Sequence, residues 1–263
     1  MKIVDMKVTI RILLALSVLC SLTTSVPAQE KTITVAAAAD LSAALKEIAA
    51  DFQKQKGIEV KLSFGASGAL TQQIENGGPF DIFFSADMGY PQELISKGYA
   101  SSDTLYRYAV GKLILWAPDN SPLNFERNGL NTLLDPLVQK IAIANPERAP
   151  YGRAAMAALK HAGLYDKVSS RLVTAENISQ AAQFVDSGNA QVGFVALAHA
   201  MAPDMKGKGK YWLVPAEDYP TIDQGVIVMS HSSHKEESKQ FIDFMKAKEA
   251  SAILQRYGFT LPQ

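Results

Sequence analysis

The chain has 263 residues, 48% of them hydrophobic and 20% charged, so it can bury a substantial core in about one or two domains. Its 26 lysines and arginines balance its 26 aspartates and glutamates, and no basic run is long enough to follow a phosphate backbone. This composition is that of an ordinary globular protein, and it excludes nucleic acid as an expected partner.

Residues 1–28 have the pattern of a signal peptide. A basic start precedes the apolar run "ILLALSVLC", and "VPA" at residues 26–28 offers small residues for cleavage near Ala28. Leu19 is too bulky for a usual lipoprotein site at Cys20, so we expect a periplasmic protein without a lipid anchor. An uncleaved membrane anchor is the alternative, although the apolar run is short for a spanning helix. Cys20 is the only cysteine, so we expect no disulfide after cleavage.

The first part of the remaining chain alternates patterns typical of strands and of helices. "TITVAAA" predicts a strand, and apolar residues from Leu41 to Phe52 then recur at helical spacing. "EVKLSF" predicts a second strand, which a short helix follows up to the turn at residues 76–78. "FDIFF" predicts a third, buried strand, and Pro91 opens a helix that ends near Gly98.

The same alternation restarts near Tyr108. The stretches "YAVGKLILWAP", "KIAIANP" and "AQVGFVAL" predict strands, with helices at "GLNTLLDPLVQK" and "GRAAMAALKHAG" between them. After "KYWLVP" come another strand, "GVIVMS", and one long helix from about Lys235 to Ile253. Because domain termini tend to lie close together, we assign this last part to the first domain.

These patterns predict an α/β protein of two lobes. Lobe 1 is expected to comprise residues 29–107 plus 222–263, and lobe 2 residues 108–221. Strands near "YAVGKL" and "TIDQGVIV" would form the hinge between them. Parallel sheets bind ligands at the carboxyl ends of their strands, where helix N-termini point, so we expect a ligand cleft between the lobes.

The stretch "SFGASGAL" places Ser67 between two glycines where a strand gives way to a helix. A nucleophilic role is disfavoured, because the pattern is not G-x-S-x-G and no histidine stands in a suggestive place. His231 and His234 have no acidic or cysteine partner at metal-ligand spacing, so a solvated turn is favoured there. We interpret Ser67 as a helix N-cap whose hydroxyl, with the N–H of Gly68, faces the cleft and binds an oxyanion. An ordinary structural cap is the alternative.

Similar strand-to-helix turns recur along the chain. Asp40 and Ser67 precede helices of the first lobe, while residues 150–152 and 177–178 precede helices of the second, so four turns could converge on one anion. These segments resemble the periplasmic molybdate-binding proteins of ABC importers, which have the type II periplasmic-binding-protein fold. The most specific stretches are "AAAADLSAAL", "SFGASGALTQQIENGGPFDIFFSAD", "IANPERAPYGRAA", "AENISQAAQFVDSGNAQVGFVAL" and "RYGF".

The resemblance implies a receptor, not an enzyme, that needs no cofactor. It would capture molybdate or tungstate with neutral hydrogen-bond donors and deliver the anion to an inner-membrane ABC permease and its ATPase, and we expect it to act as a monomer. The implied oxyanion contacts are Ala39, Asp40, Ser67, Gly68, Tyr151 and Ile178. The resemblance implies that Asp40, Ser67, Tyr151 and Ile178 meet the metal centre only as contacts to the oxyanion.

Asp40 departs from the family pattern, in which a small, hydroxyl or amide residue stands at this position. A carboxylate 4 Å from an anion is repelled by roughly 4 kcal/mol per unit charge at an effective dielectric near 20. Three resolutions are open: the side chain caps its own helix, coordinates the metal centre directly, or accepts a hydrogen bond from a protonated oxyanion such as phosphate. We favour capping.

Three rival functions remain open at the level of sequence. A receptor for phosphate or another tetrahedral oxyanion is motivated by Asp40, and an exported serine hydrolase by Ser67. The ligand-sensing domain of a regulator shares the two-lobe fold. The signal segment and the lack of a DNA-binding region argue against the last of these.

Overall fold

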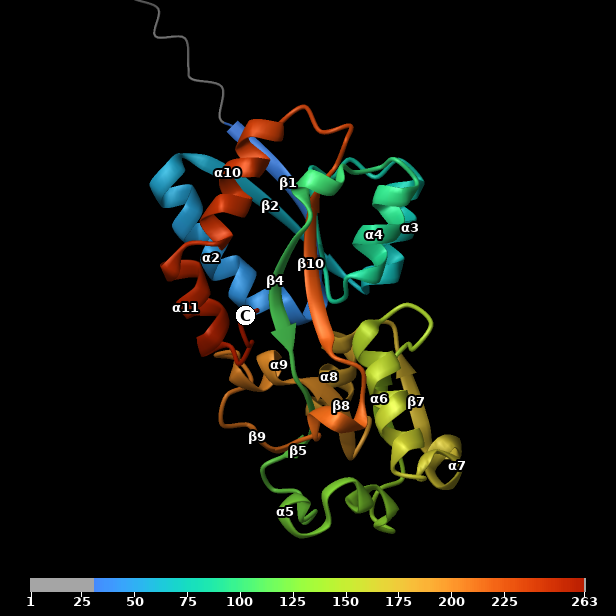
Figure 1. The fold of residues 1–263 in the computed structure, drawn as a ribbon. Helices are drawn as coiled ribbons and strands as arrows, with labels where there is room; N and C mark the ends of the chain where they lie inside the picture. Colours follow the sequence, from blue (N-terminus) through green and yellow to red (C-terminus); the bar gives the residue numbers. More distant parts are fainter. Residues whose placement is uncertain (1–30, 263) are drawn as a thin grey trace, which may run out of the picture. The chain divides into compact units, whose positions relative to one another are not determined.

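The computed structural model describes residues 31–262, and the expected signal peptide lies outside them. The described chain forms two α/β lobes, each built on a five-stranded sheet (Figure 1). None of the helices in this part is both long enough and apolar enough to cross a membrane.

The sheet of lobe 1 has the strand order β2-β1-β3-β10-β4. Strand β1 pairs in parallel with β2 and β3, whereas β10 runs antiparallel to both β3 and β4. The strands are β1 (Lys31–Ala38), β2 (Ile58–Gly65), β3 (Ile82–Ser85), β4 (Tyr106–Gly111) and β10 (Ile222–Val228). The helices are the 3₁₀ helices η1 (Ala39–Leu41) and η2 (Ser102–Thr104), with α2 (Ser42–Lys56), α3 (Ser67–Glu75), α4 (Gly89–Ser96), α10 (Lys235–Met245) and α11 (Lys248–Arg256).

The sheet of lobe 2 has the order β7-β6-β8-β5-β9. Its strands are β5 (Leu113–Pro118), β6 (Ile141–Ala144), β7 (Leu172–Ala175), β8 (Val192–Ala196) and β9 (Gly209–Leu213). Its helices are α5 (Phe125–Asn128), η3 (Gly129–Leu134), α6 (Pro150–His161), α7 (Tyr165–Val168), η4 (Ser169–Arg171), α8 (Ile178–Asp186), α9 (Leu197–Met201) and η5 (Ala216–Asp218).

Three predicted elements differ from the structure. The expected long C-terminal helix is two helices, because Ala247 adopts an extended backbone and lets the apolar faces of both α10 and α11 turn to the core. The helix expected over residues 129–140 is only the short η3, since Pro136 cannot continue a helix. The single strand expected from Tyr108 is two strands, divided at Lys112, that belong to different sheets.

The chain therefore passes between the sheets twice, at Lys112 between β4 and β5 and again between β9 and β10. Gly111 lies at the first passage, and a side chain there would collide with the Tyr151 hydroxyl and with the amide nitrogen of Gln224. The glycine thus allows two polar side chains to approach the backbone at the hinge.

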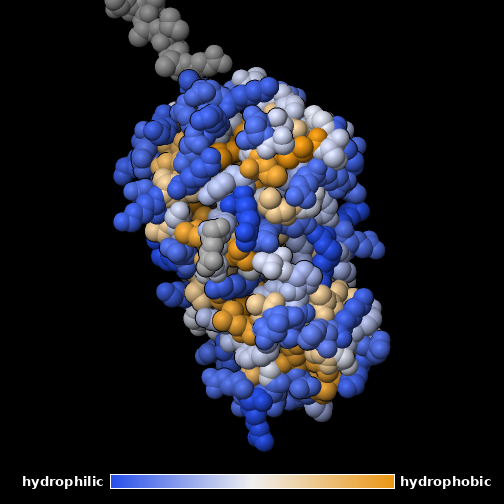
Figure 2. Space-filling view, viewed as in Figure 1, coloured by the Kyte–Doolittle hydropathy of each residue, from blue (hydrophilic) through white to orange (hydrophobic). Residues whose placement is uncertain are grey.

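Apolar side chains are collected inside the two lobes. One buried cluster lies mainly in lobe 2 and reaches Ala38 and Ala66 of lobe 1. Two further clusters lie mainly in lobe 1, where Phe52, Phe84 and Phe241 pack edge to face. On the face seen in Figure 2, hydrophilic residues dominate and hydrophobic ones show in scattered patches. The packed cores make each lobe a firm support for the turns at its sheet edge.

Candidate functional site

A small cavity lies where helices begin at the carboxyl ends of strands from both sheets. From lobe 1 it is reached by η1 after β1 and α3 after β2, and from lobe 2 by the start of α6 after β6 and of α8 after β7. Its volume is about 10 Å³, which is enough for roughly one water molecule. The lining residues are Ala38, Ala39, Asp40, Gly65, Ala66, Ser67, Ala86, Ala149, Pro150, Tyr151 and Ile178. Five of the six predicted contact residues thus meet here, and Gly68 is the exception.

The cavity offers hydrogen-bond donors without a positive side chain. Its lining, as far as the structure describes the chain, holds no lysine, arginine or histidine, and Asp40 is its one ionisable carboxyl group. The first N–H groups of each helix have no acceptor within the helix and carry the positive end of its dipole. Such a site can hold an oxyanion through neutral donors alone.

Ser67 lies in the cavity, but it is not the N-cap that the sequence predicted. The N-cap of α3 is Ala66, and Ser67 is the first helical residue. Its hydroxyl oxygen accepts a hydrogen bond from the N–H of Ala86, 3.0 Å away, which ties α3 to the loop after β3. The hydroxyl keeps its own hydrogen and can donate it to an anion.

Asp40 also differs from the favoured prediction. It lies within η1, and the N-cap residues of η1 and of α2 are Ala38 and Leu41, so Asp40 is the N-cap of neither helix. Instead its Oδ2 accepts a hydrogen bond from Gln224 Nε2 at 2.5 Å, while within residues 31–262 its Oδ1 is buried without a hydrogen-bond partner. Burial raises the pKa of Asp40 to about 6, although the hydrogen bond from Gln224 opposes the rise.

Gln224 is the centre of a buried polar group that sequence analysis missed. Tyr108 in β4 donates from its hydroxyl to Gln224 Oε1 at 2.6 Å, and Gln224 Nε2 lies 3.4 Å from the Tyr151 hydroxyl. Burial, together with the charge of Asp40, raises the pKa of both tyrosines well above the usual range, so they stay neutral donors. The available signal was a glutamine in the hinge strand "TIDQGVIV", just before its apolar run.

Gly68 forms a contact between the lobes and does not line the cavity. Its N–H donates to the carbonyl of Arg148, 2.8 Å away in lobe 2. A Cβ at Gly68 would lie 3.0 Å from that carbonyl oxygen and would also press on the hydroxyl of Tyr90. Nearby, Arg153 of α6 forms an ion pair with Asp87 of lobe 1 and stacks over the ring of Tyr90. Sequence analysis missed this rim of cross-lobe contacts.

A hydrogen-bonded pair of a serine and a histidine lies just behind the cavity, and the sequence analysis did not predict it. Ser179 of α8 lies 2.7 Å from His199 Nε2 and donates to the carbonyl of Ala39 at 3.1 Å, so it links lobe 2 to η1. Burial lowers the pKa of His199 to about 4, so the ring is neutral near pH 7. The histidine of the predicted turn, His234, lies elsewhere, with Nδ1 3.2 Å from Asp81. Residues 31–262 contain no cluster of three or more His, Cys, Asp or Glu side chains suited to a metal ion.

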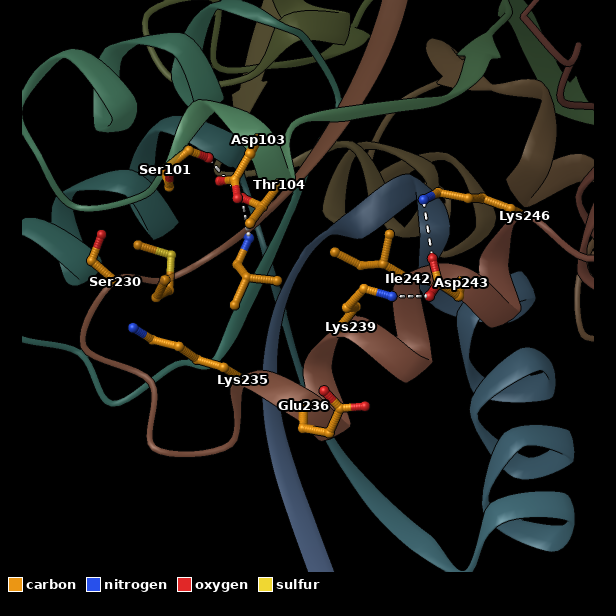
Figure 3. Close-up of a pocket in the computed structure, with 12 residues that line it drawn as sticks. Ser101, Asp103, Thr104, Ser230, Lys235, Glu236, Lys239, Ile242, Asp243 and Lys246 are labelled. Carbon is orange, nitrogen blue, oxygen red and sulfur yellow. Dashed lines mark hydrogen bonds and ion pairs between the residues drawn. The ribbon is translucent and has the colours of Figure 1, made fainter.

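A larger cavity of about 390 Å³ lies in lobe 1 between η2, the end of β10 and α10 (Figure 3). Lysines and carboxylates alternate along it, and Lys239 and Lys246 both pair with Asp243. Two of its three lysines are therefore already paired with a carboxylate, and lobe 2 contributes nothing to it. This cavity is less suited to an anion than the small one.

Two lobes with a cavity between their helix N-termini define the class of solute-binding proteins. The family model for bacterial extracellular solute-binding proteins matches residues 33–260. The chain is similar to the molybdate-binding protein ModA of Rhodobacter capsulatus, with 37% identity over 89% of this chain and 90% of that protein. It is also similar to the solved periplasmic molybdate-binding protein of Azotobacter vinelandii, with a TM-score of 0.83, 37% identity and coverage of 88% and 100%. The chain belongs to the ModA family of molybdate-binding proteins, as the resemblance in its sequence implied.

The two-lobed type II fold is confirmed by the same likeness, and it is shared more widely. The sulfate-binding protein SubI of Mycobacterium tuberculosis matches with a TM-score of 0.73 at 17% identity, covering 88% of this chain and 87% of that one. The fold alone therefore does not select the anion. The choice must come from the residues that line the cavity.

Proposed function

We propose that this protein captures molybdate or tungstate outside the cytoplasm and delivers it to an ABC importer. Its family consists of transport receptors and not of enzymes, so no covalent chemistry at Ser67 is required. The observation that carries the proposal is the small cavity between helix N-termini of both lobes, which no basic side chain of the described residues lines. A tetrahedral anion there would touch both lobes at once, and the lobes would close on it about the hinge.

The proposed donors are the hydroxyls of Ser67 and Tyr151 and the N–H groups that begin the helices at Ala39 and Ile178. Ser67 and Tyr151 are each only 1% exposed, so water competes little with a bound anion. We assign Gly68 to the cross-lobe contact, because its N–H is already bonded to Arg148. Selectivity over sulfate would come from cavity size, since donors spaced for a larger anion are not all satisfied by a smaller one.

The partners and the location follow from this function. We propose an inner-membrane permease with its ATPase as the receiving partner, a monomeric receptor, and cleavage of the signal segment near Ala28. The extracellular solute-binding family supports export. Mass measurement of the protein recovered from the periplasm tests the cleavage site, and a mass that includes residues 1–28 contradicts it.

Phosphate is a second candidate ligand, and a specific observation favours it. Oδ1 of Asp40 has no hydrogen-bond partner in the described structure, and a carboxylate oxygen can accept the proton that phosphate, unlike molybdate, carries at neutral pH. The two candidates predict opposite responses to the two anions.

Thermal unfolding of the chain without residues 1–28 tests the proposal, with molybdate, tungstate, sulfate and phosphate added separately at equal ionic strength. A ligand at ~100 times its Kd stabilises by about 2.7 kcal/mol. For a chain of this size that corresponds to roughly 5–11 °C. We expect this shift with molybdate and tungstate and none with sulfate. A shift with phosphate alone favours the second candidate, and no shift with any of the four contradicts both.

A further inference from the structure

Asp40, which lines the cavity, has one carboxyl oxygen without a partner. The residue is 3% exposed, its Oδ1 is buried, and within residues 31–262 no group donates a hydrogen bond to this oxygen. A buried carboxylate oxygen without a donor is a costly arrangement, which proteins usually avoid by pairing or by protonation.

The other carboxyl oxygen is already committed. Gln224 Nε2 donates to Oδ2 at 2.5 Å, and in the same amide orientation its Oε1 accepts from the hydroxyl of Tyr108 at 2.6 Å. Since Oδ2 is held as an acceptor, a proton on this carboxyl group has its place on Oδ1. That is the oxygen left without a protein partner in the site.

The cavity has no cationic side chain that could offset a dianion beside an ionised carboxylate. Within residues 31–262 no lysine, arginine or histidine lines it, and its donors are hydroxyl and backbone N–H groups. Because Asp40 lines the same cavity, its ionised form would repel a bound dianion. A protonated Asp40 is instead one more neutral donor, of the same kind as Ser67 and Tyr151.

We propose that Asp40 takes up one proton from solvent when the oxyanion binds, and donates it from Oδ1 as a hydrogen bond to an oxygen of the anion. This rests on the proposed function and adds to it a coupling between anion capture and protons. Asp40 would serve as a specificity-determining residue. As a donor it favours fully deprotonated anions such as molybdate, whereas an anion that carries a proton of its own needs an acceptor at this place.

Asp40 is the ionisable group near η1 whose charge changes near neutral pH, because its ionisable neighbours stay neutral there. Tyr108 and Tyr151 stay neutral because burial raises the pKa of each, and His199 on α9 stays neutral because burial lowers its pKa to about 4. The pKa of Asp40 itself is raised to about 6, so its proton is nearly available at neutral pH.

The remaining charged groups on the helices packed against η1 face elsewhere. On α2, Lys46 lies over the ring of Phe64, and Glu47 is paired with Arg256 of α11. On α8, Asp186 is exposed and stands at the opposite end of the helix from the cavity. None of these groups touches Asp40.

The coupling has a defined pH profile. With the free carboxyl at a pKa of about 6, binding should take up about 0.9 proton at pH 7 and about half a proton at pH 6. The Kd for molybdate should therefore rise about tenfold per pH unit above pH 7 and level off below pH 6. A binding site with no linked proton gives a flat profile over the same range.

Isothermal titration of molybdate at pH 7.5, in two buffers of different ionisation enthalpy, counts the protons directly. We expect close to one proton in the natural chain and none in Asp40→Asn, whose amide donates without titrating. Asp119→Asn changes an exposed carboxyl outside the site and should keep the full proton uptake. Binding with no proton uptake by the natural chain overturns the inference but leaves the function intact, whereas no molybdate binding at all overturns the function.

Infrared difference spectra keep the inference testable where Asp40→Asn fails to bind or fold. Molybdate added to the natural chain at pH 7.5 should convert one carboxylate band into a protonated carboxyl band. Proton uptake without that band, or proton uptake that persists in Asp40→Asn, assigns the proton to another group and contradicts the role of Asp40.

Discussion

Replacing Asp40 by asparagine should stabilise the protein without any ligand. The carboxyl group is fully buried, and its pKa in the folded state is about 6 against an ordinary value of 3.8. A raised pKa means that the folded state favours the neutral form. The stability tied to the protonated group is thus fully present below pH 3.8 and is lost as the pH rises through 6.

The magnitude follows from the two pKa values. At 1.36 kcal/mol for each tenfold change in proton affinity, a rise from 3.8 to about 6 means that ionised Asp40 destabilises the folded state by ~3 kcal/mol at pH 8. Asparagine keeps the acceptor for Gln224 and removes the charge. We therefore expect Asp40→Asn to melt roughly 6–12 °C above the natural chain at pH 8.

Differential scanning calorimetry at pH 8 and pH 4 measures this effect. The advantage of Asp40→Asn should shrink to about 0.5 kcal/mol at pH 4, where the natural carboxyl is protonated in the folded state and only partly ionised in the unfolded state. Asp119→Asn, at an exposed position, is the matched control and should change little at either pH. Equal melting temperatures at pH 8, or an advantage that does not depend on pH, would refute the reasoning.

Two further predictions concern the contacts around the cavity. Gly68→Ala places a Cβ against the carbonyl of Arg148 and should weaken molybdate binding by about tenfold in titration calorimetry, the equivalent of roughly one hydrogen bond. Gly89→Ala, whose Cβ meets nothing closer than 3.8 Å, is its control, and equal losses in the two variants would contradict a specific cross-lobe role. His199 has a lowered pKa, so its contribution to stability falls as the pH drops from 6.5 towards 4. Between pH 7 and pH 4.5, the free energy of unfolding measured in urea should fall by about 2 kcal/mol less in His199→Gln than in the natural chain. Equal falls in the two proteins would contradict the lowered pKa of His199.

Much of the architecture was accessible from hydrophobic periodicity. In β1, β2 and α2, the spacing of the apolar residues shows which face of the element is buried against the core of the lobe. This spacing is a local property of the sequence. The division of the C-terminal helix at Ala247 was not accessible, because both halves keep an apolar face and only tertiary packing decides where the chain bends. The passage at Lys112 between two sheets was hidden for the same reason, since both flanking strands are apolar.

The site was predicted where it depends on strand-to-helix turns, and missed where it depends on contacts distant in sequence. Ser67 was found from its place after a strand, and the resemblance to the family added Tyr151, although the cap of α3 proved to be the residue before Ser67. Gln224 reaches Asp40 across 184 positions of sequence. No local pattern predicts such a partner, and so the side chain of Asp40 was assigned to its own helix instead.

The location of bound tungstate is the most direct test of the account. A crystal structure of the chain with tungstate, solved at the tungsten absorption edge, should place one anomalous peak among η1, α3, α6 and α8, within hydrogen-bonding reach of Ser67 and Tyr151 through the oxygens of the anion. A peak in the lysine-lined cavity beside α10 (Figure 3), with the small cavity unoccupied, would contradict the claim that the helix N-termini of both lobes hold the anion.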